Sequence, residues 1–184
     1  MKRTLTILIM IAVSIGLGYT YDKVMTSLEK KSHPIPALYE KIVEKYSEEY
    51  NVPEYIIYSV IKAESSFRSD VVSEAGAVGL MQITPDTFDW LMTYQLRESL
   101  ASGLLFDPET NIKYGTYYLR YLYQKFDSWD IAFIAYNAGP NSEWLNNPEY
   151  IKDKEILYIP IEETRNYVKK VNKNIETYKR LYFS

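Results

Sequence analysis

Apolar residues recur every three or four positions along most of this chain, and this spacing constrains its fold more than any other feature. One face of an α-helix has this period, whereas a half-buried strand alternates apolar and polar residues. Alternating runs are missing here, and proline and glycine mark the expected helix ends. The expected helices cover about 38–50, 53–64, 84–92, 107–126, 129–138 and 160–178. The sequence therefore predicts a single all-α domain over residues 37–184.

A nearly unbroken apolar run over residues 5–17 follows Lys2 and Arg3. The run is shorter than the about 20 residues of a spanning helix, but it suits the core of a secretory signal, which has about 7 to 15 residues. Tyr19 and Tyr21 would form an aromatic belt if the segment stayed in the membrane as an anchor. Either outcome places the rest of the chain outside the cytoplasm. The sequence therefore predicts a signal peptide or signal anchor at 1–21 and a connector at 22–36.

Composition excludes several kinds of chemistry. The chain has no cysteine, and its single histidine, His33, lies in a connector that prolines interrupt. Thiol nucleophiles, disulfides and cysteine-ligated metals are therefore excluded. The net charge of −3 does not favour the strongly basic face that phosphate groups need, so nucleic acid is not an expected partner. We expect no metal and no cofactor, and acid–base chemistry must come from Asp, Glu, Lys or Tyr.

Glu64 occupies a position where the helical pattern calls for an apolar residue. It follows Val60 by four residues and Ile57 by seven, so it shares their core-facing stripe. Burial there would disfavour the charged carboxylate and raise its pKa, which keeps a general acid protonated near neutral pH. A glutamate paired with a cation at the helix end would occupy the same position, so the pattern alone leaves both interpretations open.

Five sequence blocks occur in the order found in one enzyme family. They are ESSF at 64–67, GAVGLMQ at 76–82, the stretch 107–119 that begins DPETNI, AYNAGP at 135–140 and ETRNYV at 163–168. Together they closely resemble the catalytic domain of the soluble lytic transglycosylases, over about residues 38–182. The resemblance implies a lysozyme-like fold related to goose-type lysozyme. It also implies cleavage of the β-1,4 bond between N-acetylmuramic acid and N-acetylglucosamine in peptidoglycan, leaving a 1,6-anhydromuramic end.

The resemblance implies roles for individual residues. One family glutamate, which Glu64 matches, protonates the leaving oxygen and then removes a proton from the sugar's C6 hydroxyl, so no second carboxylate is required. Ser73 matches a position that contacts the muramic side, and Gln82 ends the block that lines the sugar groove. Further groove positions match Tyr136, Asn137 and Glu163, with Met81 and Tyr167 as walls for sugar faces. The expected partners are peptidoglycan strands and, through the N-terminal segment, the cytoplasmic membrane; no protein partner is indicated.

Three alternatives stay open. Ser59 and Lys62 fit the S-x-x-K pattern of penicillin-binding proteins, but the accompanying motifs do not occur in the chain. Asp70 or Glu74 could supply the second carboxylate of a lysozyme-type hydrolase. A catalytically silent peptidoglycan-binding module would keep the groove, although binding alone does not favour a desolvated acid at position 64.

Two stretches depart from the family pattern. Arg68 and Ser69 stand where Asn-Pro often follows the first block, and residues 141–158 match no motif, so we predict no contacts there. Ordinary structural roles also stay open for some candidates: a tight turn at Gly76 and Gly79, and core packing or helix capping at Tyr136, Glu163 and Tyr167.

Overall fold

The structure is a computed structural model that describes residues 2–98 and 101–184, with side chains at 10–11, 13–98, 101 and 103–184. The chain divides into two compact units, Met1–Pro34 and Ile35–Ser184. The two units are described separately below.

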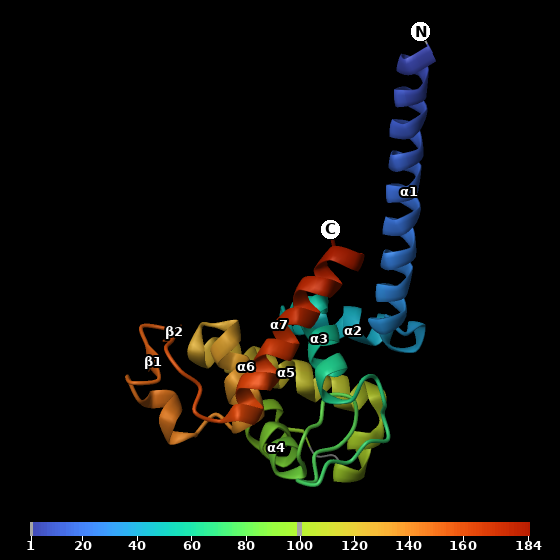
Figure 1. The fold of residues 1–184 in the computed structure, drawn as a ribbon. Coiled ribbons are helices and arrows are strands. Elements are labelled where there is room, and N and C mark those ends of the chain that lie inside the picture. Colours follow the sequence, from blue (N-terminus) through green and yellow to red (C-terminus); the bar gives the residue numbers. More distant parts are fainter. Residues whose placement is uncertain (1, 99–100) are drawn as a thin grey trace. The chain divides into compact units, whose positions relative to one another are not determined.

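The first unit is one long helix, α1 (Lys2–Ser32) (Figure 1). The hydroxyls of Ser14 and Thr20 donate to carbonyls one turn earlier, which satisfies them inside an apolar sequence. The helix continues past residue 21, so the irregular part of the connector is confined to 33–36. Among the side chains that the structure defines, no helix offers a stretch long and apolar enough to cross a membrane.

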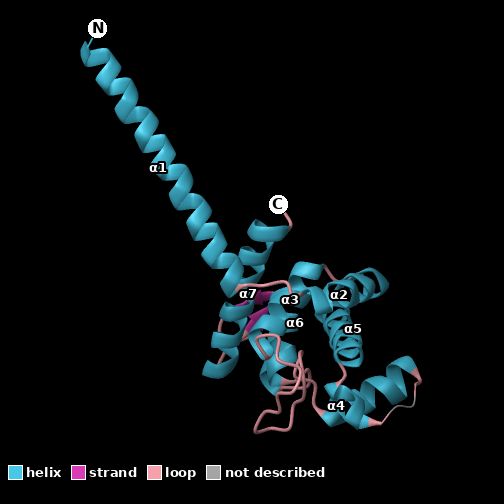
Figure 2. Cartoon of the chain, turned by 90° about the vertical axis from the view of Figure 1, so that its right-hand side faces the viewer, coloured by secondary structure: helices cyan, strands magenta, loops and turns pink. Residues whose placement is uncertain are grey.

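The second unit is helical, and this confirms the all-α fold class. Figure 2 shows helices throughout and one small strand pair. The α-helices are α2 (Ala37–Tyr50), α3 (Glu54–Glu64), α4 (Pro85–Trp90), α5 (Pro108–Phe126), α6 (Trp129–Ala138) and α7 (Glu162–Tyr182). Short elements are the π-helix η1 (Leu91–Leu96), the 3-10 helices η2 (Ser102–Phe106) and η3 (Glu143–Asn146), and the strands β1 (Ile151–Lys152) and β2 (Glu155–Ile156).

Local sequence signals explain where two of the helices begin. The Thr84 hydroxyl accepts a hydrogen bond from the backbone N–H of Thr87 at 3.2 Å, and Pro85 opens α4. Asp107 caps α5 in the same way through the N–H of Thr110 at 2.8 Å. These caps satisfy donors that have no partner inside the first helical turn, and proline fits that turn because it lacks the N–H. Both predicted helix starts are confirmed.

Helix α3 forms the centre of the core. Residues 56–61 and Ala63 are buried, and α3 packs against α2 on one side and α7 on another (Figure 1). Helix α5 in turn packs against α2 and α6. Most residues of α3 are buried, and its last residue, Glu64, lies at the boundary between the core and the surface.

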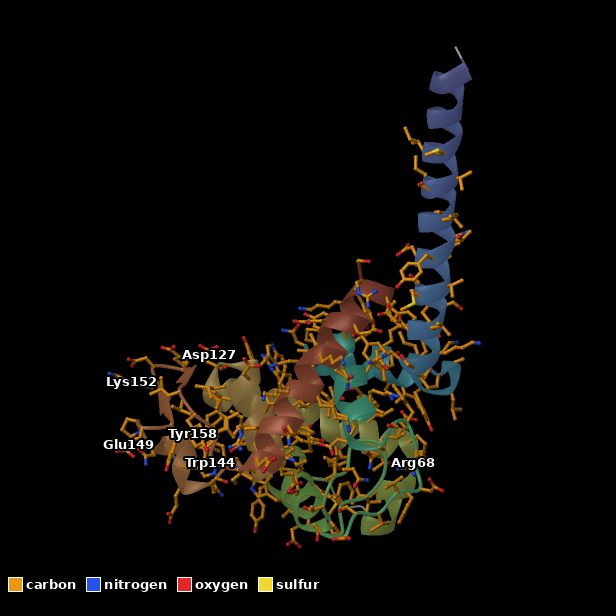
Figure 3. All side chains as sticks on the ribbon, in the orientation of Figure 1. Arg68, Asp127, Trp144, Glu149, Lys152 and Tyr158 are labelled. Carbon is orange, nitrogen blue, oxygen red and sulfur yellow. The ribbon has the colours of Figure 1, made fainter. Side chains whose placement is uncertain are left out.

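The segment between α6 and α7 contains a hairpin that the sequence did not predict. Strands β1 and β2 pair antiparallel, with Ile151 opposite Ile156, and both isoleucines pack against the core. Asp153 and Lys154 have φ values of 50° and 66°, as a two-residue hairpin turn requires. The Lys154 amine forms an ion pair with Asp127 at 2.5 Å, which joins the turn to the residue after α5. Figure 3 labels Asp127 and also Lys152, which precedes the turn.

The loop between α3 and α4 is held in place from α5. The buried Asn111 side chain accepts a hydrogen bond from the N–H of Met81 at 2.7 Å, and it donates to the carbonyls of Val78 at 2.9 Å and Leu105 at 2.8 Å. Gly79 passes directly over this amide, because a Cβ atom at Gly79 would overlap Asn111. The loop is therefore fixed by buried polar contacts despite its glycines.

Gly76→Ala and Gly79→Ala form a matched pair that tests this anchoring. The two glycines have nearly equal φ values, 79° and 78°, so both substitutions incur the about 1 to 2 kcal/mol cost of a left-handed alanine. A Cβ atom meets nothing within 4 Å at Gly76 but overlaps Asn111 and Leu105 at Gly79. We expect Gly79→Ala to lower the free energy of unfolding by at least about 2 kcal/mol more than Gly76→Ala, measured by chemical denaturation. Equal losses would contradict the anchoring.

Candidate active site

Glu64 is a half-buried carboxyl group at the end of α3. Burial raises its pKa from 4.5 to about 7, and the negative charge of Glu163 acts in the same direction. Tyr167 and the positive charge of Lys170 oppose the shift. Desolvation is the largest of these effects, so a large fraction of Glu64 is protonated at neutral pH.

Helix α7 contributes three of the groups that surround Glu64. Glu163, Tyr167 and Lys170 follow one another at four and three residues, so they lie on one face of the helix. Glu163 is exposed in the first turn, where the helix dipole favours a negative charge. The Tyr167 hydroxyl is buried near the Glu64 carboxyl, but its geometry does not form a hydrogen bond with any described residue. It remains available as a donor to the carboxylate or to a ligand, because burial raises its pKa well above the ordinary value.

Helix α6 contributes Tyr136 and Asn137 from its last turn. The Tyr136 hydroxyl donates to the carbonyl of Met81 at 2.7 Å, and burial together with the charge of Glu64 raises the pKa of Tyr136 well above the ordinary value. The Asn137 side chain accepts a hydrogen bond from the Thr164 hydroxyl at 2.7 Å. These two bonds join the end of α6 to the α3–α4 loop and to the start of α7.

The chain changes direction sharply after Glu64. The buried Ser65 hydroxyl donates to the Leu80 carbonyl at 2.8 Å and holds the loop against the end of α3. Ser66 and Phe67 have φ values of 52° and 66°, and Gln82 has 51°. Each costs about 1 to 3 kcal/mol for a residue other than glycine. The strained residues lie at the two ends of the segment that borders the site.

A groove continues from Tyr136 along α4 and α5. One cavity of about 240 Å³ adjoins another of about 400 Å³, and Thr87, Tyr118 and Pro140 line both. The smaller is also lined by Gln82, Ile83, Thr84, Tyr136, Asn137, Ala138 and Gly139, and the larger by Asp86, Trp90, Tyr121 and Asn141. Aromatic faces combined with amides, hydroxyls and a carboxylate are typical of sugar-binding surfaces.

The structure brings most of the predicted site residues together. Tyr136, Tyr167 and Glu163 surround Glu64, while Gln82 and Asn137 line the groove. Ser73 lies in the loop, where its hydroxyl accepts a hydrogen bond from the N–H of Ala77 at 3.0 Å. Its contact with a sugar stays a prediction.

The prediction that Met81 forms a wall of the groove is wrong. Its side chain is fully buried and packs against Gly115, where any Cβ atom would overlap it. Only the backbone of Met81 takes part in the site, through the hydrogen bond that it accepts from Tyr136.

The residues proposed for two alternative enzymes lie apart from Glu64's immediate partners. Asp70 and Glu74 are exposed loop residues, and neither is among the groups that shift the pKa of Glu64. The Ser59 hydroxyl is buried inside α3, where it donates to the Tyr55 carbonyl at 2.6 Å. This hydroxyl is satisfied within its own helix and is not exposed as a nucleophile.

The sequence analysis did not identify Asn111, Ser65 or Lys170. The sequence contained a signal for Asn111. Like Glu64 on α3, Asn111 is a polar residue on the buried side of its helix, where it precedes Ile112. Ser65 was part of a quoted block but had no assigned role. The Lys170 amine donates to the carbonyl of Ala63 at 2.5 Å, a contact that only the packing of α7 on α3 creates.

Comparison with known proteins identifies the family. A family model described as the transglycosylase SLT domain matches residues 41–159. The chain belongs to this family. The soluble lytic murein transglycosylase of Escherichia coli K12 is 37% identical over 142 residues, which cover 74% of this chain and 22% of that protein. The resemblance that the five blocks indicated is thereby confirmed.

Two further SLT relatives extend the comparison. The membrane-bound lytic murein transglycosylase C of Edwardsiella ictaluri is 31% identical over 206 residues, which cover 98% of this chain and 55% of that protein. The structure of an inactive Glu-to-Gln mutant of the lytic transglycosylase Slt from Pseudomonas aeruginosa superimposes with a TM-score of 0.70 at 27% identity, over 80% of this chain and 24% of that one. The chain thus spans about a fifth to a half of the length of these relatives.

Glu64→Gln tests the raised pKa through protein stability. Between pH 4.5 and about 7 the folded protein binds more protons at this carboxyl than the unfolded chain does, so wild-type stability falls as pH rises through this window. Glutamine does not titrate. The melting temperature of the variant relative to wild type should therefore increase from pH 4.5 to 7 and then level off. A difference that is constant across this range would contradict the raised pKa.

Proposed function

We propose that this SLT-family chain is a peptidoglycan lytic transglycosylase that cleaves the β-1,4 bond between N-acetylmuramic acid and N-acetylglucosamine and leaves 1,6-anhydromuramic ends. The observation that carries the proposal is the half-buried Glu64, whose carboxyl group has a pKa of about 7 beside Tyr136, a residue of the groove. The names of the relatives support the same activity.

The proposed reaction uses Glu64 twice. The protonated carboxyl group first donates its proton to the glycosidic oxygen, and the bond from that oxygen to C1 breaks. The carboxylate then accepts the proton of the C6 hydroxyl while that oxygen bonds to C1, so Glu64 ends protonated and no water is consumed. A pKa near the working pH serves both transfers. The Pseudomonas relative is described as inactive when one glutamate is exchanged for glutamine, which supports an essential glutamate in the proposed reaction.

Tyr167 and the groove residues are proposed to hold the substrate and the carboxylate. The buried Tyr167 hydroxyl can donate to Glu64 when it is ionised between the two transfers. The Gln82 amide nitrogen donates to the carbonyls of Val71 and Gly79, so its side-chain oxygen is the atom proposed to accept from a sugar hydroxyl. The Asn137 oxygen accepts from Thr164, so its amide nitrogen is the atom proposed to donate to the sugar. Ser73 is proposed to contact the muramic side. The aromatic residues of the larger cavity, Trp90 and Tyr121, can stack on sugar faces farther along a glycan strand.

Lysozyme-type hydrolysis is the second candidate function. Glu163 is a carboxylate close enough to raise the pKa of Glu64, and a pair of carboxyl groups is what glycoside hydrolysis ordinarily requires. A water molecule activated by Glu163 would then replace the C6 hydroxyl as the nucleophile. The two candidates differ in their products.

We further propose that residues 1–21 direct export and that residues 37–184 form the catalytic domain outside the cytoplasm. Basic residues followed by an apolar run support an export signal. The relatives include proteins named soluble and membrane-bound, which fits either a cleaved or a retained segment. The mass of the mature chain after membrane fractionation decides between these two forms, and a full-length chain in the cytoplasm would contradict export.

Product analysis tests the reaction. Mass spectrometry of peptidoglycan digested by the protein should show muropeptides with 1,6-anhydromuramic ends, each one water lighter than the hydrolytic product. Digestion in H₂¹⁸O should leave these products unlabelled. Reducing ends that carry ¹⁸O as the main product would instead support hydrolysis through Glu163.

Glu64→Gln tests the catalytic assignment. The amide keeps the size of the side chain but has no transferable proton, so turnover should fall by about 10² to 10⁴ or more while the protein stays folded and still binds glycan strands. The matched control is Glu74→Gln, which changes an exposed carboxylate in the neighbouring loop and should keep wild-type turnover. Wild-type turnover in a folded Glu64→Gln protein would rule out the mechanism.

A further inference from the structure

Helix α7 is joined to α3 by two side-chain hydrogen bonds. The Lys170 amine donates to the carbonyl of Ala63 at 2.5 Å, and the Asn174 amide donates to the carbonyl of Ser59 at 3.1 Å. The two contacts are four residues apart on each helix and run in opposite order along the chain. The helices are therefore antiparallel here (Figure 1), and the two hydrogen bonds join consecutive turns of α7 to consecutive turns of α3.

The contact of Lys170 lies at the end of α3, where helix carbonyls lack partners. The carbonyl of Ala63 would need the N–H of residue 67, but α3 ends at Glu64 and Phe67 has left-handed backbone geometry. The lysine amine takes the place of that N–H. Its positive charge also suits the electronegative C-terminus of a helix. Lys170 thus fixes the residue immediately before Glu64.

The same face of α7 carries the other groups that act on Glu64. Glu163 and Tyr167 precede Lys170 by seven and three residues, so they share one helical stripe. If α7 moved along α3, the distances from Glu163 and Tyr167 to the Glu64 carboxyl would change. The hydrogen bond from Lys170 to the Ala63 carbonyl fixes the relative position of the two helices one residue before Glu64.

We propose that Lys170 is a positioning residue for Glu64, which holds the last turn of α3 against α7 and stabilises the carboxylate that forms after the first proton transfer. The proposal rests on the acid–base role proposed for Glu64. The positive charge of Lys170 favours the ionised form of Glu64, which must exist after the first proton transfer and before the second.

The groups that act on Glu64 have opposing charges. From α7, Lys170 is positive, Glu163 is negative and Tyr167 is a neutral donor, and from α6 Tyr136 interacts with Glu64 as a neutral phenol. Loss of the Lys170 charge leaves Tyr167 alone to oppose burial and the charge of Glu163, so the pKa of Glu64 rises. A general acid works only while protonated, so activity falls as pH rises through its pKa. A higher pKa therefore moves this alkaline fall in activity to higher pH.

Lys170→Met removes the amine but keeps most of the stem. We expect kcat to fall roughly 10- to 100-fold through misplacement of Glu64, with little change in KM, and the alkaline limb to move upward by roughly half to one pH unit. Lys170→Arg keeps both the donor and the charge, so its alkaline fall in activity should lie at the wild-type pH and it should retain most of the wild-type kcat. The matched control is Lys169→Met, because Lys169 is an exposed neighbour that makes no hydrogen bond or ion pair with the described residues, and it should behave as wild type.

Two results would overturn the role of Lys170. One is a wild-type kcat and pH profile in Lys170→Met, and the other is an equal loss of kcat at every pH with the limb unmoved. If Lys170→Met is too unstable to assay, Lys170→Gln is compared with Lys170→Arg. Both variants retain a hydrogen-bond donor, and only Lys170→Arg retains the charge. Identical pH profiles of these two variants would then overturn the role of Lys170. Failure of the proposed function is recognised separately, because Glu64→Gln would then remain active.

Discussion

The packing of α7 across the end of α3 is the constraint on which the site depends. It covers the last turn of a helix that is otherwise buried, and so it leaves Glu64 only half exposed. A carboxylate at a helix C-terminus is opposed by both desolvation and the helix dipole. The fold thereby produces a glutamic acid with a pKa of about 7, and Lys170 and Tyr167 on α7 limit the shift.

The α3–α4 loop depends on the same region of the fold. Met81 lies where supports from α5 and α6 meet, because its N–H donates to Asn111 and its carbonyl accepts from Tyr136. Ser65 joins the loop to the end of α3 through the carbonyl of Leu80. Three helices thus hold one strained loop beside Glu64, and the groove begins where this loop ends at Gln82. The contacts of Asn111 and Ser65 are buried and that of Tyr136 is partly buried, which makes each of them costly to lose.

In the proposed function, acid–base chemistry and substrate binding fall on different parts of the fold. The carboxyl group and its partners come from α3 and α7, whereas the cavities of the groove are lined mainly by α4, α5 and the end of α6. Tyr136 belongs to both parts, since it lines the smaller cavity and interacts with Glu64. Through this connection, a glycan strand bound as proposed in the groove would present one bond to the carboxyl group.

The sequence by itself determined the helices, because apolar spacing and capping residues such as Thr84 and Asp107 act over a few positions. It also made Glu64 a candidate site residue, since a carboxylate on an apolar stripe departs from a short-range pattern. Tertiary structure alone decided that Met81 faces the core and that Lys170 meets the carbonyl of Ala63, a residue 107 positions away. The hairpin at 151–156 also depends on packing, through Ile151 and Ile156. Helical periodicity specifies which face of an element is buried, whereas the partner of each buried group is set by how distant elements pack together.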